Sequence, residues 1–92
     1  MRLEWSEAAD ADRWDLFSFV ELDSPRTAAM LDNRLVAGAL RLTEFPYSGR
    51  IGRVVDTREL VVTGTPYIAI YITAPDAVVI LRVLHAAQAW PP

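Results

Sequence analysis

Cysteine and lysine are absent from this sequence, and histidine occurs once, as His85. The lack of cysteine excludes a disulfide framework, a thiolate nucleophile and a zinc site with sulfur ligands. A single histidine excludes every site that needs two, and a Ser-His-Asp triad would need an acidic partner that the sequence does not place. The chain also has no Gly-rich phosphate loop, no metal-ligand cluster and no pair of carboxylates at catalytic spacing. We therefore expect no cofactor and no metal site.

Long hydrophobic runs are also scarce. The longest uncharged run, residues 60–75, contains Gly64 and Pro66 and is too short to span a bilayer. The first seven residues contain no apolar signal segment. The chain has 92 residues, of which 52% are hydrophobic. This composition predicts one compact domain over residues 1–92, located in the cytoplasm and without a membrane partner.

Positive charge comes from arginine alone, with 9 basic against 12 acidic residues and a net charge of −3. This balance argues against direct binding to nucleic acid, which depends on clustered cations. Arg50, Arg53 and Arg58 nevertheless form the one dense cationic cluster of the chain. We expect them to contact a target or partner protein, because guanidinium groups offer planar bidentate contacts. The alternative is a solvated loop with ion pairs to Asp56 or Glu59.

Three residues are candidates for a catalytic role, namely His85, Arg58 and Arg82. His85 ends the last predicted strand, where hydrogen bonds or packing against Trp90 explain a histidine more often than catalysis does. Arg82 stands in an apolar strand, where an arginine needs a carboxylate or carbonyl partner. Alternation puts Arg82 on the face of Ile80 and Leu84, or beside the helices if a bulge intervenes.

Helix signals occupy the first half of the chain. A short strand over residues 3–5 precedes Ser6, which is a typical N-cap for a helix that begins near residue 7. Ser24 caps a second helix, with Pro25 at its first position, and the pair Phe45-Pro46 ends it. The spacing predicts an antiparallel helical hairpin with two core stripes. These are Ala9, Leu16, Phe17 and Val20, and Ala28, Leu31, Leu35, Ala39 and Leu42.

The second half changes to β-branched and aromatic residues after a loop over residues 46–52. Strands are predicted over residues 58–62, 67–73 and 78–85, and their short connections imply an antiparallel meander. In the middle strand we expect Ile68, Ile70 and Ile72 to pack under the helices, with Tyr67 and Tyr71 facing outward. The fold class is therefore α+β, in the order βααβββ, with the helical hairpin on one face of an antiparallel sheet.

Several large apolar side chains exceed what so small a core hides. Each of them alone is typical of a core-edge residue, but together they indicate a surface that a partner covers. They are Trp14, Phe19, Met30, Leu40 and Trp90.

Four segments of the carboxy-terminal half stand out, namely residues 57–62 (TRELVV), 64–71 (GTPYIAIY), 79–86 (VILRVLHA) and the pair Trp90-Pro91. In these segments the chain resembles the RelE/ParE superfamily of type II toxin–antitoxin toxins. Upstream, Phe45-Pro46 followed by Gly49-Arg50 is similar to the family's loop after the helical hairpin. The resemblance implies a bacterial growth-inhibiting toxin in a hetero-oligomeric complex with a cognate antitoxin, ParD-like or similar.

This superfamily divides by target, so fold alone does not decide the activity. RelE-like members cut mRNA in the ribosomal A site, using lysines, arginines and a tyrosine near the carboxy terminus. This chain has no lysine, has Ile68 where the middle strand would carry an arginine, and has no tyrosine after Tyr71. The resemblance is therefore closer to the ParE branch and implies DNA gyrase as the target. The alternative is a ribosome-dependent mRNA endoribonuclease of the RelE type.

Overall fold

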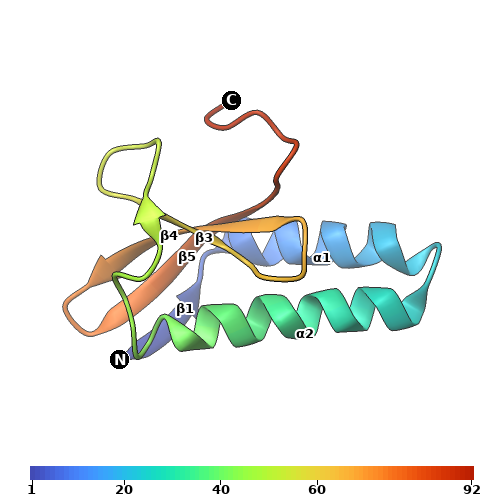
Figure 1. Ribbon diagram of the computed structural model, residues 1–92, viewed down its shortest axis with the longest axis horizontal. Coiled ribbons are helices and arrows are strands. Elements are labelled where there is room, and N and C mark those ends of the chain that lie inside the picture. The colour runs from blue at the N-terminus through green and yellow to red at the C-terminus, as the bar shows by residue number, and fades with distance from the viewer.

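The computed structural model describes residues Met1–Pro92 as two helices and a five-stranded sheet (Figure 1). The elements follow in the order β1 (Arg2–Trp5), α1 (Glu7–Glu21), α2 (Pro25–Arg41), β2 (Arg50–Ile51), β3 (Arg58–Val61), β4 (Tyr67–Ala74) and β5 (Ala77–His85). In space the strands lie in the order β1-β5-β4-β3-β2. The α+β class and the helical hairpin are as predicted. Neither helix combines the length and the apolar character that crossing a membrane requires.

Both helices begin where the capping residues predict. Ser6 Oγ accepts a hydrogen bond from the Ala9 backbone N at 3.0 Å, and Ser24 Oγ accepts one from Thr27 N at 3.2 Å. These bonds satisfy amide groups that have no partner within the helix. Four of the five stripe residues of α2 are fully buried, whereas α1 buries only Ala9 completely. The core-facing stripe of the second helix is therefore buried more completely than that of the first.

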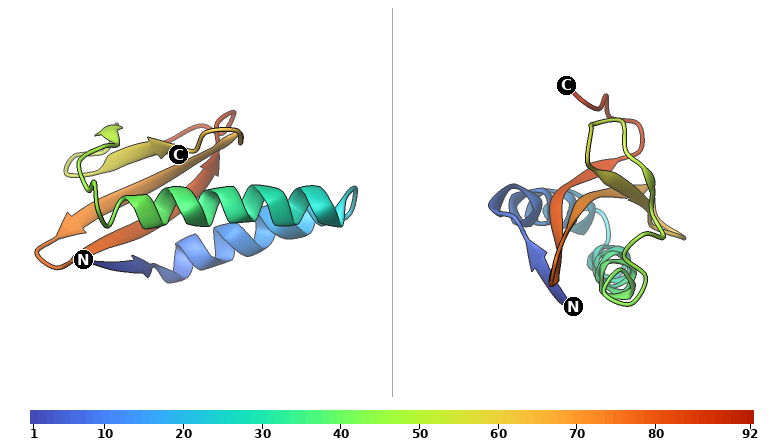
Figure 2. Two further views of the ribbon diagram at one scale, coloured as in Figure 1. Left: turned by 60° about the horizontal axis from the view of Figure 1, so that its bottom comes forward. Right: turned by 90° about the vertical axis from the view of Figure 1, so that its left-hand side faces the viewer.

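The predicted meander β3-β4-β5 is confirmed, with the predicted first strand, β1, at one edge of the sheet and an unpredicted strand, β2, at the other. At one edge β1 pairs with β5 in parallel, in register from Arg2 opposite Ala77 to Trp5 opposite Ile80. At the other edge the predicted loop contains β2, which pairs with Arg58 and Glu59 of β3 only. The sheet is thus mixed rather than wholly antiparallel. Figure 2 shows α1 and α2 side by side, with the loop before β3 and the carboxy-terminal tail on the side away from α2.

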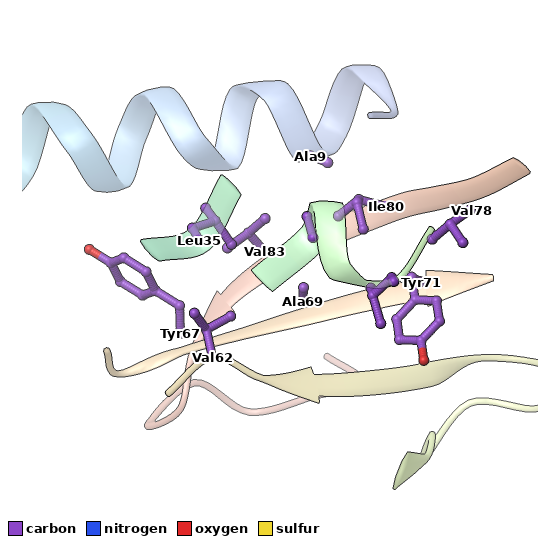
Figure 3. Close-up of a cluster of buried hydrophobic side chains, with 11 residues drawn as sticks. Ala9, Leu35, Val62, Tyr67, Ala69, Tyr71, Val78, Ile80 and Val83 are labelled. Carbon is purple, nitrogen blue, oxygen red and sulfur yellow. The ribbon is translucent and has the colours of Figure 1, made fainter. Parts of the chain in front are cut away.

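The prediction for the two faces of β4 is wrong. Tyr67, Ala69 and Tyr71 join the core cluster with the helices, as Figure 3 shows. Ile68 and Ile70 instead pack with Leu84 on the opposite, outer face of the sheet. Hydrogen bonds hold Tyr71 on the helix side of the sheet. Its Oη donates to the Pro46 carbonyl at 2.8 Å and accepts from Gly49 N at 2.9 Å. A buried tyrosine thereby closes the loop that follows α2.

Tyr71→Phe tests this closure. The substitution removes both hydrogen bonds and leaves a buried amide and a carbonyl without their partner, which costs about 1–3 kcal/mol. We expect a fall in melting temperature of roughly 4–8 °C for each kcal/mol in a domain of this size. Tyr47→Phe is the matched control, because Tyr47 is 68% exposed. Equal melting temperatures for the two variants would contradict the role assigned to the Tyr71 hydroxyl.

Candidate functional site

The candidate site is built around a buried carboxylate on β3. The Glu59 side chain is 1% exposed and forms ion pairs with both Arg50 and Arg53. Its Oε1 accepts from Arg50 Nη2 at 2.9 Å and from Arg53 Nη2 at 3.0 Å. Its Oε2 accepts from the backbone N of Arg53 at 3.0 Å and from Arg53 Nε at 3.1 Å. One carboxylate therefore fixes both β2 and the loop that follows it.

Hydrogen bonds to the arginines hold the carboxylate in its charged form. The pKa of Glu59 falls from 4.5 to about 2, chiefly through the side-chain hydrogen bond from Arg53, and this outweighs the opposing effect of burial. The same contact raises the pKa of Arg53. Two guanidinium groups and one carboxylate leave a single net positive charge at the surface, where Arg50 and Arg53 remain about half exposed.

The three arginines predicted as one patch are divided between two faces of the sheet. Neighbouring residues of a strand point to opposite faces, so Arg58 lies opposite to Glu59. Arg58 Nη1 donates to the Gly49 carbonyl at 2.8 Å and to the Tyr47 carbonyl at 3.2 Å, and its guanidinium lies 5.3 Å from the Tyr47 ring. The ion pairs to Glu59, which the sequence left as an alternative, are present. The cationic cluster is consequently a pair, Arg50 and Arg53.

Arg82 finds its partner on α1, in a residue that sequence reasoning did not single out. Its Nε and Nη2 donate to the two Asp12 carboxylate oxygens at 2.8 and 3.1 Å. Asp12 also accepts from the backbone N of Val83 at 2.8 Å. A bulge lies here, because Ile70 pairs with Arg82 whereas the next residue, Tyr71, pairs with Ile80. The acidic group needed beside Arg82 was predictable, but its position 70 residues earlier was not.

The carboxy-terminal tail covers the outer face of the sheet. Trp90 packs against the cluster of Ile68, Ile70 and Leu84. Its carbonyl accepts from Arg53 Nη1 at 3.3 Å, and the Arg82 guanidinium lies 5.8 Å from its ring. Trp90 is therefore an internal contact of the arginine site rather than part of an exposed flank.

His85 is exposed and takes part in the turn that begins the tail. Its Nδ1 accepts from Ala87 N at 3.1 Å, and its backbone N donates to Gln88 Oε1 at 2.6 Å. Neither Arg58 nor Arg82 is hydrogen-bonded to it, so the three catalytic candidates do not form one site. No group of three or more acidic or histidine side chains is placed to hold a metal ion.

The helical hairpin exposes four of the five apolar side chains expected on the flank. Trp14 is 72% exposed and Phe19 77%, and Met30 and Leu40 are about half exposed. Leu22, at the turn of the hairpin, adds a further apolar side chain that the sequence analysis missed. An apolar surface of this kind is typical of a protein that is covered by a partner.

The chain is similar to known proteins over nearly its whole length. Residues 3–90 match the family described as ParE toxin of type II toxin-antitoxin system, parDE. The chain is 40% identical over 90 residues to "Putative toxin Y4kP" of Sinorhizobium fredii, covering 98% of this chain and 93% of that protein. It is 36% identical over 84 residues to "Toxin RelE2" of Caulobacter vibrioides, covering 91% and 93% respectively. The fold matches a chain of the chromosomal ParDE system from P. aeruginosa with a TM-score of 0.81 and 25% identity, covering 92% of this chain and 95% of that one.

The dependence of the unfolding free energy on pH tests the ion pairs of Glu59 with Arg50 and Arg53. A carboxylate with a lowered folded pKa stabilises the protein above its unfolded pKa, and this contribution is lost as pH falls from 4.5 toward 2. We expect the wild type to lose about 3 kcal/mol of unfolding free energy through this group across that window. Glu59→Gln should be less stable at neutral pH. Its unfolding free energy, measured by denaturant titration at each pH, should fall less steeply between pH 4.5 and 2. Other carboxylates titrate in both proteins, so parallel curves would contradict the assignment.

Proposed function

The chain belongs to the ParE toxin family of type II toxin–antitoxin systems, and we propose that it arrests bacterial growth by poisoning DNA gyrase. A cognate antitoxin neutralises it in this proposal, and the toxin acts in the cytoplasm, where gyrase works. No cofactor is required. The toxin acts by contact with the enzyme rather than by chemistry of its own.

The observation that carries the proposal is the set of side chains on the outer face of the sheet, which are apolar or paired in ion pairs. A ribonuclease needs groups there that move protons and stabilise developing charge. In this chain the middle strand presents Ile68 and Ile70, and Trp90 covers them. The neighbouring Arg53 and Arg82 are paired with carboxylates. These features support a binding role over a catalytic one.

The gyrase contact is assigned to the pair Arg50 and Arg53. Glu59 holds both side chains in one geometry, so little side-chain entropy is lost when they bind. Arg50 bonds to Glu59 through Nε and Nη2 only, which leaves its Nη1 group free for an acidic or carbonyl partner. Arginine at such a place offers the planar contacts that protein interfaces favour.

The antitoxin contact is assigned to the exposed apolar side chains of the hairpin, namely Trp14, Phe19, Met30 and Leu40. Covering them removes apolar surface from water, which is favourable at about 25 cal/mol per Å². Binding of the antitoxin also stabilises the folded toxin by mass action.

A ribosome-dependent mRNA endoribonuclease is the second candidate. One relative, from Caulobacter vibrioides, is named "Toxin RelE2". Arg82 and His85 also stand close together in sequence at the end of β5. The two candidates predict different products and are separated by one pair of assays.

The test is to add purified toxin to gyrase and relaxed plasmid, and separately to a translation reaction with a labelled transcript. Gyrase poisoning predicts loss of supercoiling with accumulation of cleaved plasmid, and intact transcripts. Cut transcripts with normal supercoiling would overturn the gyrase proposal in favour of the ribonuclease. In cells the corresponding signs are filamentation with a DNA-damage response, or an abrupt arrest of translation.

His85→Ala provides a residue-level prediction. A general acid or base contributes roughly 100- to 10,000-fold to a rate. We expect the variant to retain gyrase inhibition and growth arrest within about tenfold of the wild type, because His85 serves only its own turn. The folded state is checked by circular dichroism. A collapse of toxicity in a folded variant would place His85 in a catalytic site.

A further inference from the structure

β2 and the loop that follows it form a projecting segment, residues 50–57, on the side of the sheet away from α2 (Figure 1). Two apolar side chains of this projecting segment stand in water, because Ile51 is 75% exposed and Val55 83%. The turn of the helical hairpin lies at the other end of the molecule. Apolar side chains that gather on one segment mark a contact surface, whereas single ones scattered over a protein do not.

The projecting segment is held in one conformation by hydrogen bonds of its own. Gly52 N donates to the Thr57 carbonyl at 2.8 Å, and the Val54 carbonyl accepts from Thr57 N at 3.2 Å and from Thr57 Oγ1 at 2.7 Å. Gly52 has no room for a side chain, since a Cβ there would collide with Thr57. Asp56 has a left-handed φ of 65°, which aspartate tolerates better than most residues. A segment fixed in this way loses little conformational entropy when it binds.

The side chains of β2 point to both faces of the sheet. Arg50 pairs with Glu59 in the strand register and lies on the same face, where its guanidinium meets the carboxylate. Ile51 pairs with Arg58 and therefore lies on the opposite face. Ile51, Asp56 and Arg58 are among the residues that line a hollow of about 320 Å³ there. The projecting segment thus carries net positive charge on one face and Ile51 on the other.

We propose that the projecting segment inserts into a cleft of gyrase, with its two arginines against an acidic wall and with Ile51 and Val55 against apolar side chains. The inference rests on the gyrase contact of the proposed function and specifies its shape and chemistry. A contact with the arginine face alone would leave Ile51 in water, where its side chain contributes nothing to affinity. Insertion removes the apolar surface on both sides of the same segment from water.

The composition of the projecting segment suits the centre of a protein interface, where arginine and apolar side chains are common and acidic ones are rare. Residues 50–55 (RIGRVV) contain two arginines and three branched apolar side chains, and no acidic residue. Glu59 already pairs with both guanidinium groups, which reduces the cost of removing them from water. The single net positive charge that remains selects an acidic wall over a basic one.

The experiment measures the inhibition of gyrase supercoiling by purified variants of the toxin. Ile51→Ser and Val55→Ser each remove an apolar contact without adding charge. Each should raise the toxin concentration needed for half-inhibition at least about fivefold. Arg50→Gln should have an effect of the same size, and it leaves Glu59 paired with the second arginine. Melting temperatures should stay close to that of the wild type, because the replaced side chains are half exposed or more.

Leu22→Ser is the matched control, because Leu22 is 88% exposed but lies at the hairpin turn. It should change the concentration for half-inhibition less than about twofold. Antitoxin affinity, measured in parallel, should be unchanged in Ile51→Ser and Val55→Ser. A matching fall in antitoxin affinity would assign the projecting segment to that partner and overturn the inference.

Full inhibition of gyrase by Ile51→Ser, Val55→Ser or Arg50→Gln would also overturn the insertion, because one part of the projecting segment would then lie outside the contact. The same holds if Leu22→Ser loses as much inhibition as the other variants. In these cases the wild type still inhibits gyrase, and the proposed function stands. A wild-type toxin without any effect on gyrase would refute the proposed function and this inference together.

Discussion

The burial of Glu59 is the constraint on which the arrangement of the outer face depends. A carboxylate at this position is costly to remove from water, and its pairing must be nearly complete to repay that cost. Arg50 and Arg53 supply that pairing from β2 and the loop after it, and Arg53 then reaches the carbonyl of Trp90. One buried charge thus ties together a two-residue strand, the loop after it and, through Arg53, the tail, which also packs through Trp90 on the outer face.

This pairing also decides where free positive charge remains. Glu59 and Asp12 pair with three arginines of the outer face, which leaves one net positive charge there. Arg34 and Arg41, on α2, form no ion pair with a carboxylate. Positive charge without a carboxylate partner is therefore present beside α2 as well as on the outer face, where it can attract an acidic partner.

The sequence predicts those parts of the fold that depend on local signals. Ser6, Ser24 and Pro25 act within one helical turn, and short connections leave no alternative to a meander. The faces of β4 were not predictable, because both are apolar and alternation does not say which one meets the helices. The contact of Tyr71 with the loop after α2, and that of Arg82 with Asp12, join residues 22 to 70 positions apart. Such contacts leave no periodic signal in the chain.

The same network bears on how the toxin could act. Acid–base catalysis works best with a group whose pKa lies near the working pH. Hydrogen bonds from arginine lower the pKa of Glu59 to about 2, and burial raises the pKa of Tyr71, so both move away from neutrality. Asp12 raises the pKa of Arg82 further, which keeps that side chain a permanent cation. Groups fixed in their charged or neutral form are well suited to binding a protein surface and poorly suited to exchanging protons with a substrate, which favours a toxin that acts by contact.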